Sequence, residues 1–335
     1  MLRRLITGLV VVAVLGALVL AGMIAFGGPV TPPVNAGLAK RDTDIAARLA
    51  DQPASETFKA RDGAALAFRR YPGTAGGGVA VLVHGSSGSN AAVHSLAKAF
   101  SAAGITALAI DARGHGASGP HGDIAYVGQL DDDMSDLAKV VAQQFPKERR
   151  LLVGHSSGGG FVLRIAGSPR GCAFDGYLAL SPYLNYAAPS NRPDAGWAAA
   201  GVPRMIALSI VDRIGITAFD NLPVVAFALE ANAPNRTATY SWRLQRNFGL
   251  DLVRWQDEIK SIDRPTRVMI GASDELFDAS MYMQIFAGLQ PLVKVSVVPN
   301  TDHMGIVLDE SAIAEVTATA RQMLQEPAPP ACLAD

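Results

Sequence analysis

The sequence predicts an α/β fold in which helices cover both faces of a mostly parallel sheet. Short apolar runs alternate with longer segments of helical periodicity from residue 79 to residue 181, and the alternation resumes near residue 267. The short runs, such as Val79–Val83, are apolar along their whole length, which is typical of strands buried on both faces. A chain of 335 residues with 49% hydrophobic composition is also apolar enough for a large core.

The chain begins with a segment that is long enough to cross a bilayer. Leu5–Phe26 is a run of 22 residues without a charge or a proline. As a helix rising about 1.5 Å per residue it would span roughly 33 Å, against about 30 Å for the hydrocarbon core. Arg3 and Arg4 precede it and no charge follows before Lys40, which predicts a cytoplasmic N-terminus and a non-cytoplasmic remainder. We expect residues 1–27 to be a single membrane anchor. Cleavage as a signal peptide, followed by secretion, is the alternative, although signal peptides have shorter apolar cores of about 7 to 15 residues.

The globular part is expected to begin at residue 56. Residues 28–55 are rich in Pro, Gly and Ala and predict a linker, with a short helix near Thr43–Leu49. A hairpin should follow, because the strand-like runs Phe58–Arg61 and Ala65–Tyr71 flank the turn pair Asp62-Gly63.

Residues 56–182 should form the first part of the core. The expected strands are Val79–Val83, Ile105–Ile110, Leu151–Val153 and Tyr177–Ser181, and the expected helices are Asn90–Ala103, Asp131–Phe145 and Ser157–Ala166. Gly104 should stop the first of these helices. Asp131, Asp132 and Asp133 lie in the first turn of the second helix, where acidic side chains favour the positive end of the helix dipole. We therefore assign these three aspartates a structural role and not metal binding.

The alternation is interrupted by residues 183–263, which predict a helical cap inserted into the core. Its expected helices are Met205–Ile214, Val224–Leu229 and Tyr240–Phe248, with Pro203 and Pro223 as boundaries. Residues 264–327 should complete the core, and residues 328–335 form a tail rich in Pro and Ala. The last expected elements are the strands Val268–Ile270 and Val293–Val298 and the helix Ala312–Leu324.

Charge and cysteine content narrow the range of partners. The formal net charge is -1, and no basic stripe with interleaved aromatic residues appears, so we expect no nucleic-acid partner. Cys172 and Cys332 are the only cysteines. A non-cytoplasmic location would permit a disulfide between them, and two unpaired thiols are the alternative. Neither cysteine has a spacing typical of a metal or redox site, and no cofactor or metal is expected.

The pentapeptide Gly154-His155-Ser156-Ser157-Gly158 points to a nucleophilic serine. It follows an apolar strand and leads into a helix, and a tight turn in this position exposes a serine next to the free N–H groups of the helix N-terminus. Glycines two positions before and after the serine avoid collisions across the turn. Ser157 is the competing nucleophile, but His155 occupies the position two before it, so we choose Ser156.

A base and an acid follow the serine along the chain, each just after a late strand. Asp274 follows Val268–Ile270, and His303 follows Val293–Val298. The order serine, acid, histidine is one of the known arrangements of a catalytic triad. Glu275 is the second choice for the acid. Asp302 is the third, because it is adjacent to His303 and would need an awkward path to orient its neighbour's ring.

Two backbone donors are expected to stabilise the oxyanion. One is the N–H of Ser157, which follows the nucleophile, and the other should come from the loop after Val79–Val83. In that loop we choose Ser86. His84 could be taken for a base, but at a strand end beside glycine we expect it to hold the loop by hydrogen bonds.

Taken together, these residues resemble the α/β-hydrolases of the monoacylglycerol lipase, lysophospholipase and serine aminopeptidase group. The matching motifs, spread over most of residues 56–325, are His84-Gly85, the D-x-R-G-x-G-x-S stretch Asp111–Ser118, Gly154–Gly159, Gly271–Asp274 and His303. In that group the stretch Asp111–Ser118 would shape a loop near the active site. Its His115, with His121 and Asp123, could also suggest a metal, which we disfavour. Family members often carry a large side chain where this chain has Ser157.

The residues and the resemblance together imply hydrolysis of carboxylic esters through an acyl-enzyme. His303 would take the proton of Ser156, and Asp274 would stabilise the imidazolium. The apolar cap and the anchor suggest a hydrophobic acyl or lipid-like substrate. One alternative is amide cleavage at a peptide N-terminus, as in serine aminopeptidases, for which Asp220 and Glu230 could bind the substrate ammonium. The other is a non-catalytic, membrane-tethered binding domain of the same fold.

Overall fold

A computed structural model of the protein describes residues 2–34, 36–192, 196–229, 235–327 and 329. Its core is an eight-stranded sheet with the strand order β1-β2-β4-β3-β5-β6-β10-β11. The strands are β1 (Ser55–Lys59), β2 (Ala65–Tyr71), β3 (Val79–Val83), β4 (Thr106–Ile110), β5 (Arg150–His155), β6 (Gly176–Leu180), β10 (Thr266–Gly271) and β11 (Val293–Val298). Only the pairs β1/β2 and β2/β4 are antiparallel, so the predicted mostly parallel sheet is confirmed.

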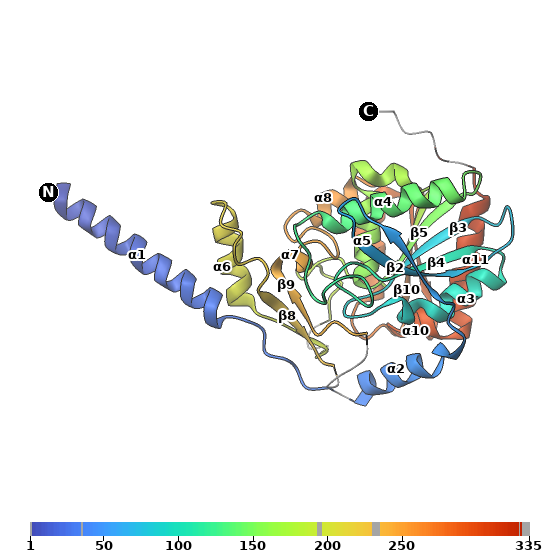
Figure 1. Cartoon of the computed structure of the whole chain (residues 1–335), viewed down its shortest axis with the longest axis horizontal. Coiled ribbons are helices and arrows are strands. Elements are labelled where there is room, and N and C mark those ends of the chain that lie inside the picture. Colours follow the sequence, from blue (N-terminus) through green and yellow to red (C-terminus); the bar gives the residue numbers. More distant parts are fainter. Residues whose placement is uncertain (1, 35, 193–195, 230–234, 328, 330–335) are drawn as a thin grey trace.

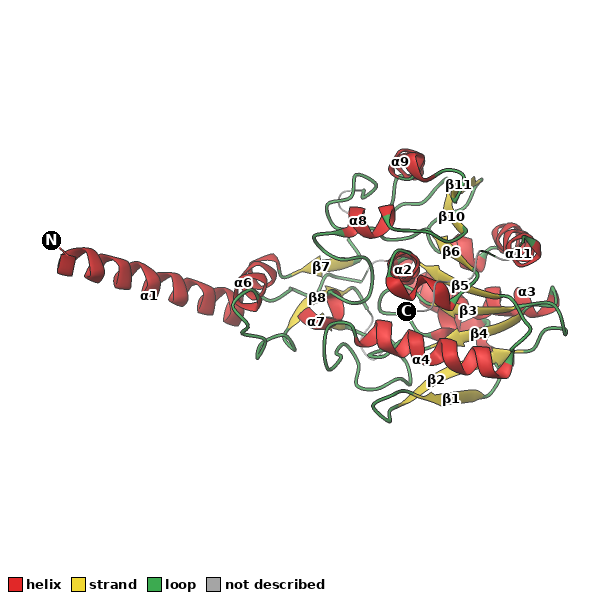
Figure 2. Ribbon diagram, turned by 90° about the horizontal axis from the view of Figure 1, so that it is seen from above, coloured by secondary structure: helices red, strands yellow, loops and turns green. Residues whose placement is uncertain are grey.

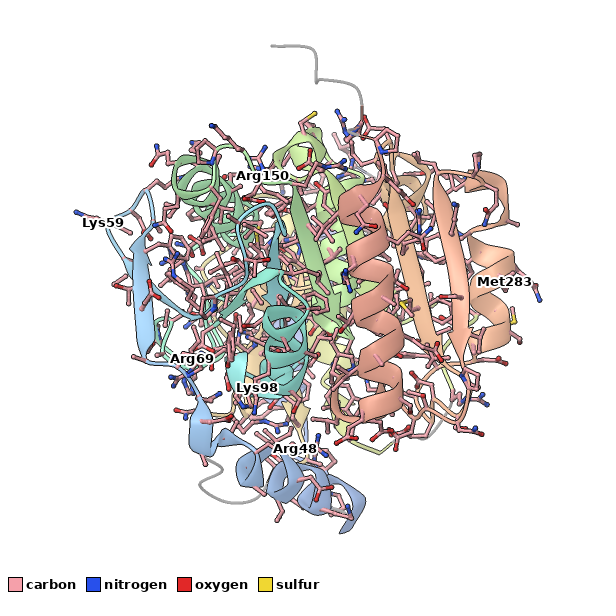
Figure 3. All side chains as sticks on the ribbon, turned by 90° about the vertical axis from the view of Figure 1, so that its right-hand side faces the viewer. Arg48, Lys59, Arg69, Lys98, Arg150 and Met283 are labelled. Carbon is pink, nitrogen blue, oxygen red and sulfur yellow. The ribbon has the colours of Figure 1, made fainter. Side chains whose placement is uncertain are left out.

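Alternate residues of each buried strand enter two separate cores, one on each face of the sheet. In β3, Val81 packs in one core and Leu82 in the other. The first core also contains side chains of α4 (Gln129–Gln144) and α5 (Ser157–Ala166). The second is covered by α3 (His94–Ala102) and α11 (Glu310–Gln325), which lie in front of the sheet in Figure 3. Because both faces of these strands are buried, apolar residues follow one another along them and do not alternate with polar ones.

Shorter elements complete the layers. The hairpin β1/β2 forms as predicted, with Gly63 in the left-handed region at φ 87°. The linker contains α2 (Ala36–Ala47), which begins before the short helix expected at Thr43–Leu49. The remaining elements are α8 (Trp255–Lys260), α9 (Ala279–Ile285), α10 (Gly305–Leu308) and four 3₁₀ turns at Leu49–Asp51, Asn90–Val93, Pro169–Ala173 and Ala287–Leu289.

The segment inserted between β6 and β10 is a mixed cap, so the prediction of a helical cap was wrong in part. The helix expected at Met205–Ile214 is present as α6 (Val202–Asp212). Residues expected as the helix Val224–Leu229 instead form β8 (Pro223–Phe227), the middle strand of a three-stranded antiparallel sheet. Its partners are β7 (Ala198–Ala200) and β9 (Thr239–Ser241), and β9 leads into the short helix α7 (Trp242–Gln245).

The reason for this error is the length of the apolar run. Five residues are too few to reveal a helical period, and the β-branched Val224 and Val225 followed by Phe227 fit a pleated strand. The region expected as the helix Tyr240–Phe248 is likewise divided between β9 and the four-residue helix α7.

The N-terminal helix α1 (Leu2–Phe26) extends away from the globular part, and its C-terminal end lies beside α6 in both Figure 1 and Figure 2. Its mean hydropathy reaches 2.9 over 18 residues, and 6% of that stretch is buried. By length and composition it is a candidate membrane span, a test that a signal sequence also passes. The side of the membrane on which the rest of the chain lies stays a prediction.

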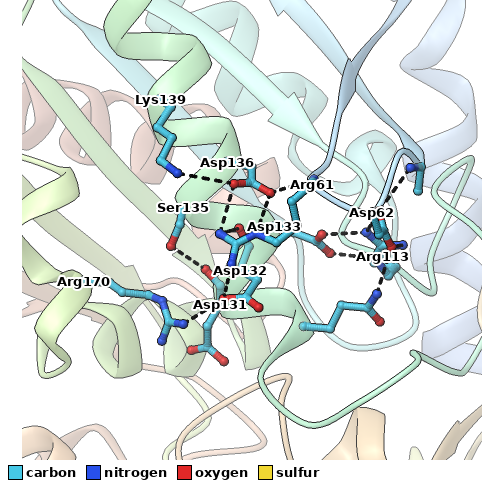
Figure 4. Close-up of polar contacts among 12 residues, drawn as sticks. Arg61, Asp62, Arg113, Asp131, Asp132, Asp133, Ser135, Asp136, Lys139 and Arg170 are labelled. Carbon is cyan, nitrogen blue, oxygen red and sulfur yellow. Dashed lines mark hydrogen bonds and ion pairs between the residues drawn. The ribbon is translucent and has the colours of Figure 1, made fainter.

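The three consecutive aspartates form ion pairs, as Figure 4 shows for two of them and their neighbours. Asp131 pairs with Arg164, Asp132 with Arg61 and Arg170, and Asp133 with Arg113. Within the described ranges no group of three or more His, Cys, Asp or Glu side chains could hold a metal ion. Asp131 and Asp132 lie in the first turn of α4, as predicted, whereas Asp133 lies beyond it.

The cysteine prediction is not tested. Cys172 lies in the 3₁₀ turn Pro169–Ala173, where its sulfur accepts a hydrogen bond from the Arg264 guanidinium at 3.0 Å. Cys332 lies outside the described residues, so the predicted pairing with Cys172 stays a prediction.

Candidate active site

Ser156 occupies the strained turn predicted between β5 and α5, and the residue is buried there, with 3% of its surface exposed. Its backbone lies at φ 55° and ψ -120°, a conformation that L-residues rarely adopt. The turn requires the two flanking glycines. A Cβ added at Gly154 would lie 2.2 Å from the carbonyl oxygen of Gly158, and one at Gly158 would lie 2.3 Å from that of His84. The strand, turn and helix predicted around the pentapeptide are therefore present.

Asp274 and His303 are in direct contact at the carboxyl ends of the neighbouring parallel strands β10 and β11. The Nδ1–H of His303 donates to Oδ2 of Asp274 at 2.9 Å, and both side chains are buried. The other carboxylate oxygen, Oδ1, accepts the backbone N–H groups of Leu276 and Phe277. Burial alone would raise the pKa of Asp274, but the bond to His303 and these two N–H groups outweigh it and lower the pKa. Asp274 is thus held as a carboxylate.

The two other acids considered for this role contact backbone groups. The Glu275 carboxylate accepts the backbone N–H of His303 at 3.0 Å, and Asp302 accepts that of Gly305 at 2.7 Å. Both therefore brace the loop that carries His303, while Asp274 contacts the imidazole ring itself.

His155 fills the space between the serine turn and His303. Its Nε2–H donates to the carbonyl oxygen of His303 at 2.9 Å, and the two imidazole rings lie 4.8 Å apart. The ring of Phe277 meets His303 edge-on at 5.1 Å. Among the hydrogen bonds of the described residues, none joins the Ser156 hydroxyl to His303. In unliganded enzymes this contact is often long and shortens when substrate binds.

The two residues expected to provide oxyanion donors lie side by side. The hydroxyl groups of Ser86, in the loop after β3, and Ser157, the first residue of α5, hydrogen-bond to each other. Gly85 allows this approach, because a Cβ there would lie 3.1 Å from the Cβ of Ser156. His84 holds the loop as predicted: its Nδ1–H donates to the Gly85 carbonyl, and its Nε2 accepts the N–H of Ala112.

The cap contributes a buried tyrosine to the same loop, which the sequence analysis did not identify. The Tyr240 hydroxyl, from β9, accepts the backbone N–H of Ser87 at 2.7 Å and contacts Nε2 of His115 at 2.6 Å. Nδ1 of His115 faces the Arg113 carbonyl and must carry the proton, so Nε2 accepts from Tyr240. Burial lowers the pKa of His115 and raises that of Tyr240, so both groups are neutral at pH 7.

Further cap contacts converge on Ser87, the next residue along from Ser86. Ser87 has φ 60°, in the left-handed region. Its carbonyl accepts hydrogen bonds from the backbone N–H of Thr237 at 3.1 Å and from Nε of Arg236 at 3.0 Å. The cap therefore holds both backbone groups of a strained residue beside the candidate oxyanion donor.

The stretch Asp111–Ser118 forms the loop that carries His115, the partner of Tyr240. The buried Asp111 carboxylate accepts the backbone N–H groups of Asn90 at 2.6 Å and Ala117 at 2.9 Å. Arg113 forms two bonds of 2.7 Å with the Asp133 carboxylate. His115 lies here as a loop-holding residue, and the metal site considered for it is not formed by the described side chains.

A cavity of about 240 Å³ lies over the two serine hydroxyls, between the core and the cap. Ser86 and Ser157 line one part of it, and the rest is mainly apolar. The apolar part of the lining includes Tyr183, Trp197, Met205, Val225, Phe227 and Leu252. Among the described residues that line the cavity, none is Asp or Glu, and Arg192 carries the charge. Asp220 does not line it, and Glu230 lies outside the described residues.

Known proteins resemble this chain in sequence and in fold. The family model of serine aminopeptidases, S33, matches residues 76–309. A monoacylglycerol lipase of Mycolicibacterium smegmatis is 37% identical over 92 residues, which cover 27% of this chain and 33% of that protein. A protein phosphatase methylesterase 1 of Gibberella zeae is 32% identical over 198 residues, 52% of this chain and 46% of that protein. The chain thus spans between a third and about half of these curated relatives.

The fold is shared with solved structures of low sequence identity. A soluble variant of the monoglyceride lipase of Saccharomyces cerevisiae, in complex with a substrate analogue, has a TM-score of 0.61 at 17% identity. The match covers 83% of this chain and 97% of that one. This likeness shows the α/β-hydrolase fold alone. Because the family model covers well over half of the sequence, the chain belongs to the α/β-hydrolases of the serine aminopeptidase S33 family, the group that includes monoacylglycerol lipases.

Proposed function

We propose that the protein is a serine hydrolase that cleaves carboxylic esters with a hydrophobic acyl group. The observation that carries this proposal is the bond of 2.9 Å between His303 and Asp274, at the same edge of the sheet as the strained turn of Ser156. The proposal is further supported by the apolar cavity over Ser86 and Ser157.

In the proposed mechanism the Ser156 hydroxyl attacks the ester carbonyl while Nε2 of His303 takes its proton. Asp274 keeps the Nδ1–H tautomer in place and stabilises the imidazolium. The negative oxygen of the tetrahedral intermediate would be stabilised by the backbone N–H groups of Ser86 and Ser157. Collapse of the intermediate transfers the proton from His303 to the leaving alcohol. Water then attacks the acyl-enzyme by the same route, and the acid is released with Ser156 regenerated.

An ester with an apolar acyl chain suits the cavity better than a peptide N-terminus. A substrate ammonium needs a carboxylate partner when it leaves water. The described lining has no carboxylate and includes a guanidinium, that of Arg192, which would repel a cation. The aromatic and aliphatic side chains of the lining match hydrocarbon instead.

The function is tested with the full chain in detergent. We expect labelling by a fluorophosphonate probe and hydrolysis of p-nitrophenyl esters. The kcat/KM for acyl chains of eight or more carbons should exceed that for acetate by about tenfold or more, because each buried methylene contributes about 0.8 kcal/mol. Aminoacyl p-nitroanilides should be poor substrates. Absence of labelling on folded protein would support a binding domain, and a preference for the anilides would support an aminopeptidase.

Replacing Tyr240 by phenylalanine should slow the chemical step by about tenfold, with little change in KM. The Ser87 N–H would lose its partner in a buried site, and the loop carrying Ser86 would no longer be held in place. Removal of an oxyanion donor itself typically costs about 10²- to 10³-fold in kcat, so displacement of one should cost less. Steady-state kinetics on a short-chain ester would measure the effect.

Tyr177→Phe is the matched control for this prediction. Its hydroxyl is also buried and donates to the Gly171 carbonyl at 2.8 Å, and Tyr177 pairs with Leu152, four residues before Ser156. Both variants should lose a similar free energy of unfolding, about 1 kcal/mol. Only Tyr240→Phe should lower kcat. An equal kcat for the two variants would contradict a positioning role for Tyr240.

A further inference from the structure

The cap helix α6 is apolar on two sides. Ala207, Leu208 and Val211 are buried in the same core cluster as Ile24 of α1 and Val224 of β8. On the exposed side, apolar residues recur every four positions and continue into the following loop, which places the helical ones on one face. These residues, with exposed fractions between 41% and 73%, are Val202, Ile206, Ile210, Ile214, Ile216 and Phe219, here called the apolar face of α6.

This helix is fastened to the C-terminal end of α1. The guanidinium of the buried Arg204 donates to the carbonyl oxygens of Ile24 at 2.7 Å and Ala25 at 3.1 Å, in the last turn of α1, and to that of Pro223 in β8 at 2.7 Å. The last carbonyls of a helix have no partner within it and form the negative end of its dipole, so a guanidinium is a suitable cap.

The backbones of the two helices also meet closely. The N–H of Arg204 donates to the carbonyl of Gly27 at 3.2 Å, and a Cβ added at Gly201 would lie 2.7 Å from that oxygen. In Figure 1, α6 runs crosswise at the point where α1 reaches the cap, and Figure 2 shows the same proximity from above. No flexible connection separates the end of α1 from α6, because the clamp engages α1 itself.

We propose that α1 and α6 form one membrane-docking unit, in which α1 spans a lipid bilayer and Arg204 holds the apolar face of α6 in the headgroup region. Continuity with α1 identifies the occupant of this face as the bilayer. With α1 across the bilayer, its C-terminal end at Phe26 lies at the membrane surface. Arg204 contacts α1 at this end, so α6 lies at the same depth. An amphipathic helix in the interface buries its apolar face by about 5–10 Å.

The consequence for substrate supply rests on the proposed function. Met205 of α6 lines the cavity over the candidate site, one residue before the exposed Ile206. A helix that lies in the interface and also forms the cavity wall would bring the cavity next to acyl chains of the bilayer. The substrate class would then be an ester that resides in the membrane, such as a monoacylglycerol, and not a water-soluble ester.

Docking is tested by fluorescence quenching in the full chain, which needs no catalytic activity. Ile210→Trp and the matched variant Met283→Trp, on the exposed side of α9 (Figure 3), would be reconstituted into phosphatidylcholine and phosphatidylglycerol vesicles with and without brominated acyl chains. The wild type supplies the background of its 3 tryptophans. We expect the added emission at position 210 to fall about twofold or more, because brominated chains quench at the depth of an interfacial helix, and that at 283 to be unchanged. Equal quenching at both positions would overturn the proposal.

A second measurement tests the clamp and the supply of substrate. Arg204→Gln should reduce the quenching of Ile210→Trp if Arg204 holds α6 at the membrane.

The double variant Ile206→Asp/Ile210→Asp should lower hydrolysis of monoacylglycerol in vesicles by about tenfold, since interfacial binding scales with buried apolar area. Hydrolysis of soluble p-nitrophenyl butyrate should stay within about twofold. Equal losses on both substrates would contradict the supply role, and a wild type inactive on both would overturn the proposed function while the quenching result still stands.

Discussion

Replacing Ser156 by alanine is expected to abolish fluorophosphonate labelling and to lower kcat for ester hydrolysis by roughly 10⁵- to 10⁶-fold, as removal of the nucleophile does in other serine hydrolases. The reason is that alanine has no oxygen to form the acyl-enzyme, while the turn at φ 55° keeps its shape because neighbouring contacts determine it. Gel-based labelling and kinetics with a p-nitrophenyl ester measure the two effects.

Ser157→Ala is the control for this result. Ser157 lies next to Ser156, and its hydroxyl contacts Ser86, but the proposed role uses only its backbone N–H, which alanine retains. Labelling should therefore persist in this variant. Undiminished labelling of Ser156→Ala, together with loss of labelling in Ser157→Ala, would show that the neighbouring serine is the nucleophile.

Replacing Asp274 by asparagine is expected to lower kcat by about 10⁴-fold with little change in KM. The amide is close in shape to the carboxylate and can still accept the N–H groups of Leu276 and Phe277. It carries no charge to stabilise the imidazolium, and it no longer favours the tautomer that leaves Nε2 of His303 free to accept a proton. Kinetics at several pH values on the folded variant would measure this effect.

Glu275→Gln separates this prediction from a general disturbance of the loop. Its carboxylate accepts the backbone N–H of His303, and the glutamine carbonyl can accept the same bond. The loss in kcat should be less than about tenfold, since a neutral hydrogen bond replaces a charged one. If Glu275→Gln lost as much activity as Asp274→Asn, the assignment of Asp274 as the acid would be wrong.

The candidate triad could be predicted because each member follows a strand of recognisable composition. Ser156, Asp274 and His303 come within five residues of the ends of β5, β10 and β11, and parallel strands place such residues at one edge of the sheet. The chemistry of the motif and the order along the chain then leave few choices. The contact between His303 and Asp274 agrees with that reasoning, and their catalytic roles stay proposals.

The cap was harder to predict, for physical reasons. A strand of five residues such as β8 owes its conformation to its partners β7 and β9, and not to a local period. Tyr240 is 153 residues from Ser87 and 125 from His115 along the chain, so no local pattern indicates that the three meet. In the sequence alone, a tyrosine with this role looks the same as an ordinary buried core residue.

The hydrogen bonds that Tyr240 and Arg236 form with Ser87 limit how the cap can be changed. The half of the insertion that contains β9 is also joined to the core by the pairing of Arg243 with Asp123 and by the N–H of Ser241, which donates to the Gly122 carbonyl. This half cannot swing open without dismantling the loop of Ser86. Grafting onto this core an insertion without a hydroxyl at position 240 should therefore lower kcat by about as much as Tyr240→Phe does.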